Sequence, residues 1–120
     1  MKNTKLWIIV AGIAGFTGVA IGAFGAHGLK NSLSPENMEI YKTGVMYHLI
    51  HAVAILAIAV SGNTKFIKSA LFFLIGIILF SFSLYLYAVT QITGFAIITP
   101  FGGVSFLVGW FLLILEGWKK

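Results

Sequence analysis

The sequence predicts an all-α integral membrane protein, a four-helix bundle with both termini on the cytoplasmic side. Three observations lead to this prediction: four apolar stretches fill most of the 120-residue chain, only 9% of the residues are charged, and the lysines lie almost entirely between the stretches. A hydrocarbon layer of roughly 30 Å needs about 20 apolar residues in a helix, whereas an average soluble domain is about a quarter charged. We therefore expect one membrane domain over residues 1–120.

The apolar stretches define the expected spans, which cover residues 6–27, 44–61, 66–88 and 95–115. The lysines in front of the first stretch also fit the start of a secretory signal peptide, with Gly25 and Ala26 near a cleavage site. A span is favoured because the stretch is longer than the apolar region of such a signal, usually about 7–15 residues. Its glycines and alanines are also spaced for helix packing.

The lysines predict the orientation of the bundle. Six of the eight share the side of both termini and the connection at residues 61–66. Cytoplasmic loops carry an excess of lysine and arginine, so this side should face the cytoplasm, and Trp7 and Trp118 agree because indole rings favour the headgroup level. The basic residues therefore indicate topology, since a nucleic-acid surface would gather them on one face. The six are Lys2, Lys5, Lys65, Lys68, Lys119 and Lys120, and the other two are Lys30 and Lys42.

Two hydroxyl–proline pairs indicate helix starts. At Ser34-Pro35 a hydroxyl can cap the first turn and proline fits the first helical position, so the second helix should begin there and lie partly in the interface before it enters lipid. Thr99-Pro100 repeats this signature inside the fourth stretch. A helix start at Pro100 would leave residues 94–99 non-helical, which lipid tolerates only where protein buries the backbone.

Small residues predict the faces on which the helices pack. In lipid, helices associate through close approach of their backbones, and small residues four apart permit it. The first span carries such a row, and we expect it to be central in the bundle. The expected packing residues are Ala14, Gly18, Gly22 and Ala26 in the first span and Gly102, Gly103 and Gly109 in the fourth.

Polar side chains are expected to gather in the outer half of the membrane. An ionisable group inside a membrane is a candidate functional residue, because burying a polar group without a partner is costly. His48 and His51 are three residues apart and share one helical surface, from which both would meet His27 if the first two helices pack together. The candidate cluster comprises His27, Tyr47, His48, His51, Tyr85 and Thr99.

Three uses of the histidines are open. A metal site would need further ligands beside the histidines, but no carboxylate is expected at the same depth and the chain has no cysteine to supply a thiolate. A proton relay usually adds a buried Asp or Glu, and the spans contain none. The favoured interpretation is that the imidazoles hydrogen-bond to tyrosine hydroxyls or backbone carbonyls and fix helix register. We expect no metal, no cofactor and no catalytic site, since no acid–base dyad, carboxylate pair or phosphate loop is visible.

Four motifs in order resemble those of a known family. They resemble the domain-of-unknown-function 423 family of small bacterial membrane proteins, which is similar to the eukaryotic transmembrane protein 256. The resemblance covers essentially the whole chain and implies a four-helix membrane fold, with no established molecular activity to transfer. The motifs are Gly22-Ala23-Phe24-Gly25-Ala26-His27-Gly28, Tyr47-His48-x-x-His51-Ala52, Leu79-Phe80-Ser81-x-Ser83-Leu84-Tyr85 and Thr99-Pro100-x-Gly102-Gly103-x-x-Phe106-x-x-Gly109-Trp110.

These observations favour a structural or interaction role in membrane organisation. The chain would then be a multi-pass protein of the bacterial cytoplasmic membrane, and its partners would be the lipid bilayer and either further copies or another membrane protein. The competing interpretation is a small permease or channel for an ion or small molecule. Transport would require an oligomer, because four short helices enclose little room for a pathway.

Overall fold

The computed structural model describes residues 2–119, in which four helices are long and apolar enough to cross a membrane. The first two are α1 (Lys2–His27) and α2 (Pro35–Ser61), and the fourth is α5 (Thr93–Trp118). The third crossing joins η1 (Thr64–Phe66), α3 (Ile67–Gly76), η2 (Ile77–Ser81) and α4 (Phe82–Thr90) without interruption. The predicted all-α four-helix membrane bundle is confirmed.

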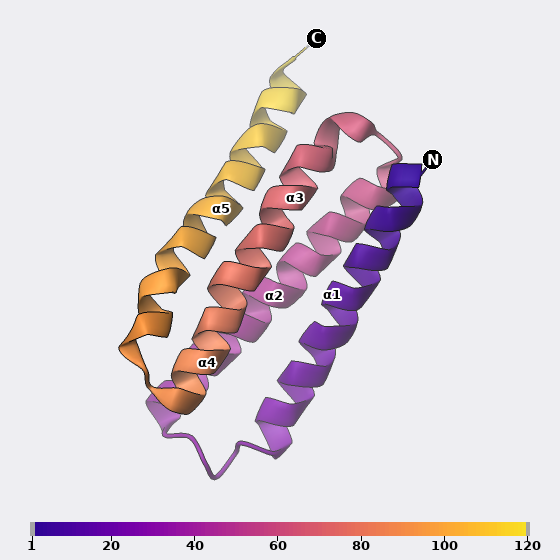
Figure 1. The fold of residues 1–120 in the computed structure, drawn as a ribbon. Coiled ribbons are helices and arrows are strands. Elements are labelled where there is room, and N and C mark those ends of the chain that lie inside the picture. The colour runs from indigo at the N-terminus through magenta and orange to yellow at the C-terminus, as the bar shows by residue number, and fades with distance from the viewer. Residues whose placement is uncertain (1, 120) are drawn as a thin grey trace.

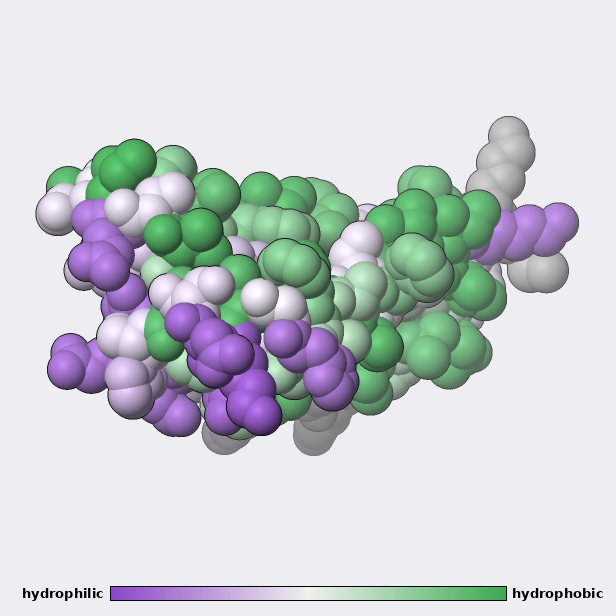
Figure 2. Space-filling view, turned by 90° about the horizontal axis from the view of Figure 1, so that it is seen from below, coloured by the Kyte–Doolittle hydropathy of each residue, from purple (hydrophilic) through white to green (hydrophobic). Residues whose placement is uncertain are grey.

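Consecutive crossings run in opposite directions, so both chain ends and the α2–α3 connection lie at one end of the bundle (Figure 1). This arrangement agrees with the distribution of the lysines, while the assignment of that end to the cytoplasm stays a prediction. Seen from below, hydrophilic side chains gather toward the end with the α1–α2 connection, and hydrophobic side chains cover the helices (Figure 2). Such a surface suits a bundle whose sides face lipid.

Helix α1 is peripheral, and the expectation that it would be central is wrong. It packs chiefly against α2, and 22% of its apolar window is buried, compared with 44% in the third crossing. The third crossing contacts both α2 and α5, and α2 contacts both α1 and the third crossing, so these two are the inner helices. A row of small residues predicts that one neighbour comes close, but it does not determine how many neighbours a helix has.

Small residues of α1 form its interface with α2. A side-chain carbon on Gly18 would lie 2.6 Å from Cδ2 of Leu49, and Gly25 lies directly against the ring of Tyr41. The expected end of the row, Ala26, is exposed instead. Since a helix has 3.6 residues per turn, a strict four-residue row winds away from a fixed neighbour, and the contact shifts back by one residue. The α1 residues on this face are Ala11, Ala14, Gly18, Gly22 and Gly25.

Helix α2 begins at Pro35, as the sequence predicts. The Oγ atom of Ser34 accepts a hydrogen bond from the backbone nitrogen of Asn37 at 3.1 Å, and the proline occupies the first turn. The helix ends at Ser61 and is capped by Gly62, whose φ of 67° is left-handed. Its 27 residues span about 40 Å at 1.5 Å per residue, which exceeds the hydrocarbon layer and leaves its first turns for the interface.

The third crossing contains a π-helical turn, η2, that the sequence did not indicate. Such wider turns are rare and are often found at functional sites. The η2 backbone lies against α5 at Gly102, where a side-chain carbon would come within 2.7 Å of Cα of Phe80. Toward α2, Oγ of Ser81 donates a hydrogen bond to the carbonyl oxygen of Gly44 at 2.8 Å. Glycines on two neighbouring helices thus accommodate the π turn.

Helix α5 begins at Thr93 and contains Pro100 in its interior, so a helix start at Pro100 is wrong. Proline cannot donate to the carbonyl four residues earlier, but transmembrane helices tolerate this where side chains and neighbouring helices satisfy the freed groups. The carbonyl that Pro100 leaves free is that of Ala96. Next to it, Oγ1 of Thr99 donates to the carbonyl oxygen of Phe95 at 3.3 Å and lies 2.6 Å from Oγ of Ser83 on α4. The threonine hydroxyl therefore supports the turn before the proline instead of capping a helix.

Candidate functional site

The buried members of the predicted cluster lie in three separate groups, not in the single outer cluster that we expected. One group joins α1, α2 and α4 around His48, a second joins α2 and α5 around His51, and a third joins α4 and α5 through Thr99. Five of the six predicted residues are therefore divided among different helix contacts.

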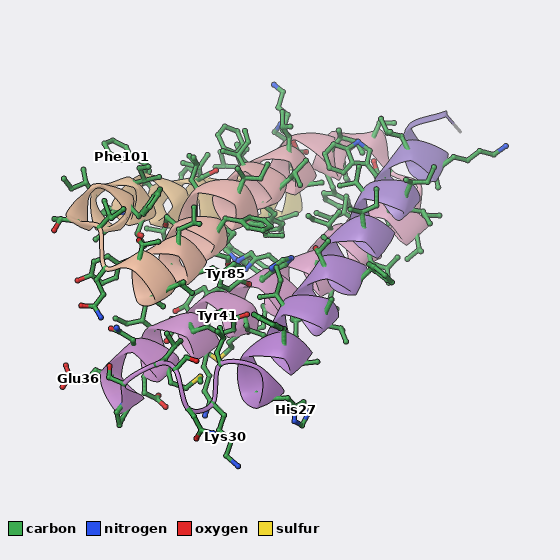
Figure 3. All side chains as sticks on the ribbon, turned by 60° about the horizontal axis from the view of Figure 1, so that its bottom comes forward. His27, Lys30, Glu36, Tyr41, Tyr85 and Phe101 are labelled. Carbon is green, nitrogen blue, oxygen red and sulfur yellow. The ribbon has the colours of Figure 1, made fainter. Side chains whose placement is uncertain are left out.

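His27 belongs to none of these groups. It is exposed at the last residue of α1 and points away from the interior, in which Tyr41 and Tyr85 face each other (Figure 3). The expected meeting of His27 with the other histidines does not occur. Because α1 and α2 are antiparallel, Thr17 lies opposite His48, and the end of α1 lies opposite the first turns of α2.

His48 is fully buried and has a hydroxyl group at each ring nitrogen. Nδ1 lies 2.7 Å from Oη of Tyr85 on α4, and Nε2 lies 3.2 Å from Oγ1 of Thr17 on α1. Oγ1 of Thr17 donates its proton to the carbonyl oxygen of Ile13 at 2.9 Å, so it can accept from Nε2. The Tyr85 hydroxyl then donates to Nδ1, and the resulting chain of hydrogen bonds links three helices.

Tyr41 adds a second polar contact between α2 and α1. Its hydroxyl donates to the carbonyl oxygen of Ile21 at 2.6 Å, and its ring centroid lies 5.2 Å from that of Tyr85. Sequence reasoning missed Tyr41 and Thr17. A signal for Tyr41 existed, because it precedes His48 by seven residues, which is two helical turns and places both on one face.

His51 is held by partners whose hydrogen-bonding roles are fixed. Nε2 accepts from Nε1 of Trp110 on α5 at 3.0 Å, and Nδ1 lies 2.8 Å from the carbonyl oxygen of Tyr47. An indole nitrogen only donates and a carbonyl oxygen only accepts, so these partners assign the proton to Nδ1 and leave the ring neutral. The ring also stacks on Phe106 with centroids 3.7 Å apart. Neither nitrogen has a lone pair free while the Trp110 bond is intact.

Thr99 pairs with Ser83 at 2.6 Å, in a contact between α4 and α5 that involves no histidine. Sequence reasoning assigned neither Ser83 nor Trp110 to the site. Trp110 follows Thr99 by eleven residues, which is about three helical turns and places both on one face of the helix. This spacing could have indicated Trp110 as a further residue of the site. Ser83 had no comparable signal, because its partner lies on another helix.

The two buried histidines differ in what they can do chemically. Hydroxyl groups both donate and accept, so the ring nitrogens of His48 can exchange roles, whereas the partners of His51 permit one arrangement only. Across residues 2–119, no three His, Cys, Asp or Glu side chains come together in a way that would hold a metal ion. The geometry suits hydrogen bonding between helices at both positions and rearrangement of a proton at His48 alone.

The chain is similar to proteins of one bacterial family. The family model described as "Protein of unknown function (DUF423)" matches residues 21–103. The UPF0382 membrane protein YwdK of Bacillus subtilis is 39% identical over 120 residues, which cover 96% of this chain and 98% of the relative. The UPF0382 inner membrane protein YgdD of Escherichia coli is 40% identical over 117 residues, which cover 94% and 89% respectively. No solved structure matches the chain.

The match includes most of the polar contacts described above. Residues 21–103 contain Tyr41, His48, His51 and Tyr85, together with the Ser83–Thr99 pair, while Thr17 and Trp110 lie outside the matched range. The two relatives extend the similarity over nearly the full length, and their names place them in bacterial membranes. With its four apolar helices, the chain therefore belongs to the DUF423 family and is a multi-pass protein of the bacterial cytoplasmic membrane.

Proposed function

We propose that the protein has a structural or interaction role in the membrane, without catalysis, and that it acts through the outer faces of its helices. The observation that supports this best is that the bundle uses its two buried histidines, His48 and His51, internally. His51 has a fixed partner on each nitrogen, and His48 has a hydroxyl on each. Side chains engaged in this way hold helices in register.

The other polar contacts between helices support the same role. Oγ of Ser105 donates to the carbonyl oxygen of Phe72 at 2.7 Å, which links α5 to α3. Among the buried side-chain nitrogen and oxygen atoms of the described residues, only Oγ of Ser69 is without a partner. A pathway for an ion or polar solute needs polar groups that can replace the solute's water, and here helix packing engages those groups.

The outward-facing surfaces of the helices are available to contact partners. Helices α1 and α5 are the peripheral ones, and they expose large apolar side chains such as Phe16, which is 77% exposed, and Leu107, which is 69% exposed. Lipid covers such surfaces by default, and a further copy or another membrane protein would dock on the same faces. The proposed partners are therefore the bilayer and one protein that contacts α1 or α5.

Photo-crosslinking in native membranes tests the interaction role. A photoreactive residue is placed at Phe16 or Leu107, and a matched control is placed at Ile55, which is completely buried. We expect a discrete crosslinked protein product from at least one exposed position and none from Ile55. Lipid adducts alone at both exposed positions would overturn the proposal.

Transport is the competing function and is tested in proteoliposomes. We expect protons, potassium ions and small solutes to cross vesicles that contain the protein no faster than they cross empty ones. A saturable flux that disappears in His48→Phe would show that the buried chain of hydrogen bonds serves a pathway. That result would replace the structural role with transport.

A further inference from the structure

We propose that the groove between α2 and α5 binds a neutral, lipid-soluble molecule with a flat ring and a carbonyl oxygen, the chemistry of a quinone. The groove has a volume of about 430 Å³ and is lined from α2, η2 and α5. None of its lining side chains is charged, so the occupant is neutral. This inference goes beyond the structural role and does not depend on it.

Aromatic rings form the walls of the groove. The His51 and Phe106 rings stack on each other with centroids 3.7 Å apart and are each 4% exposed, so they form the base. Tyr47 is 37% exposed, and its ring lies 4.8 Å from that of Phe80 at the side. The bond from Trp110 to His51 fixes the floor, while the indole itself is 43% exposed. Rigid aromatic faces favour a flat ring that can stack on them over a flexible acyl chain, which loses more conformational freedom when it is ordered.

The hydroxyl of Tyr47 supplies the polar contact. None of the side-chain hydrogen bonds within residues 2–119 uses this hydroxyl, and His51 uses only the Tyr47 backbone carbonyl. The side chain is 37% exposed and lines the groove. Tyr47 follows Lys42 by five residues, which places it about 7.5 Å deeper along the helix at 1.5 Å per residue. A phenol in hydrocarbon needs an acceptor, and a ring carbonyl in the groove would provide it.

Gly103 keeps the groove open. A side-chain carbon there would lie 3.8 Å from the Phe80 ring, which is an ordinary contact, so packing does not require glycine at this position. Glycine in a helix interior is roughly 1 kcal/mol less favourable than alanine. The space that Gly103 leaves is therefore available to a ligand that lies against Phe80.

Quenching of Trp110 fluorescence tests the proposal. The tryptophans outside the groove are replaced (Trp7→Phe, Trp118→Phe), and the full chain in lipid nanodiscs is titrated with a decyl-tailed benzoquinone. We expect saturable quenching. Methyl decanoate, which has a carbonyl and an alkyl chain but no ring, serves as the competitor and should not displace the quinone.

Two variants and one matched control locate the site. Tyr47→Phe should weaken binding about three- to tenfold, the loss expected for one hydrogen bond. Gly103→Leu fills the groove and should abolish saturation, while Gly12→Leu, at an open position on α1, should leave binding unchanged. Melting curves confirm that each variant is folded.

Several outcomes would overturn the proposal. Quenching that rises linearly with quinone and is equal in all variants would mean collision within the bilayer. Displacement by methyl decanoate would mean that ordinary acyl chains fill the groove. An unchanged affinity of Tyr47→Phe for the quinone would show that the Tyr47 hydroxyl does not contact the ligand.

Discussion

Replacing Gly102 by alanine should destabilise the bundle, whereas the same change at Gly103 should not. A side-chain carbon on Gly102 would lie 2.7 Å from C of Leu79 and from Cα of Phe80, which are backbone atoms of the π turn. Carbon atoms in optimal contact are about 3.5–4.0 Å apart, so α5 and η2 would have to separate by about 1 Å. Backbone atoms cannot rotate aside as the end of a side chain can.

The magnitude follows from the contact that is lost along this interface. A gap of about 0.5–1 Å forfeits roughly a quarter to a half of the dispersion energy between facing atoms, and overpacking typically costs about 1–3 kcal/mol. In lipid the helices associate through packing itself, so we expect a loss near 3 kcal/mol, the upper end of that range, for Gly102→Ala. At Gly103 the added carbon would lie 3.8 Å from the Phe80 ring, so the change should be neutral or stabilise by up to about 1 kcal/mol, the gain in helix propensity.

Unfolding of the two variants in mixed micelles of detergent and dodecyl sulfate, followed by circular dichroism, measures this difference. Alanine is the better helix former at both positions, so the pair isolates packing from helix propensity. Equal stability of the two variants, or a larger loss at Gly103, would refute the assignment of Gly102 to the π-turn contact.

Three further predictions concern the histidines and the topology. His51→Ala removes a stacked ring and leaves an indole without its acceptor, so the free energy of unfolding should fall by about 2–4 kcal/mol; unchanged melting in detergent would contradict a role in helix register. Tyr85→Phe removes the hydroxyl facing His48 and should cost about 0.5–1.5 kcal/mol in the same unfolding assay, and this loss should vanish when His48 is already Phe. Since the chain has no cysteine, Asn31→Cys and Asn63→Cys each provide a single labelling site. A membrane-impermeant maleimide should label only Asn31→Cys in intact cells, and labelling of Asn63→Cys instead would show that the orientation is opposite to the predicted one.

The membrane fold was predictable because lipid leaves few alternatives. A segment that crosses hydrocarbon must satisfy its backbone internally, so an apolar stretch of sufficient length becomes a helix whatever its neighbours are. The four stretches accordingly appear as four long helices. Which helix would be central was not predictable, because the small-residue row of α1 describes only its contact with α2.

Two similar local signals had different outcomes. Ser34-Pro35 follows a polar connection and caps α2, whereas Thr99-Pro100 lies inside α5. The sequence before Thr99 is apolar, so an earlier helix start keeps its backbone hydrogen-bonded within the membrane. The hydroxyl of Ser83 on α4 then supports the turn at Thr99, and this support depends on a neighbour that local sequence does not show.

The histidines show why a candidate site is harder to predict than a span. Residues three apart on a helix point about 60° apart, so His48 and His51 were expected to meet the same partners. That angle is enough to direct His48 toward α1 and α4 and His51 toward α5. The chemistry then follows from the partners: a donor and a carbonyl fix the proton on His51, while two hydroxyls leave His48 free to exchange it. A change of protonation inside this bundle should therefore act first at His48, and the contact of α1 that it would alter directly is the hydrogen bond between His48 and Thr17.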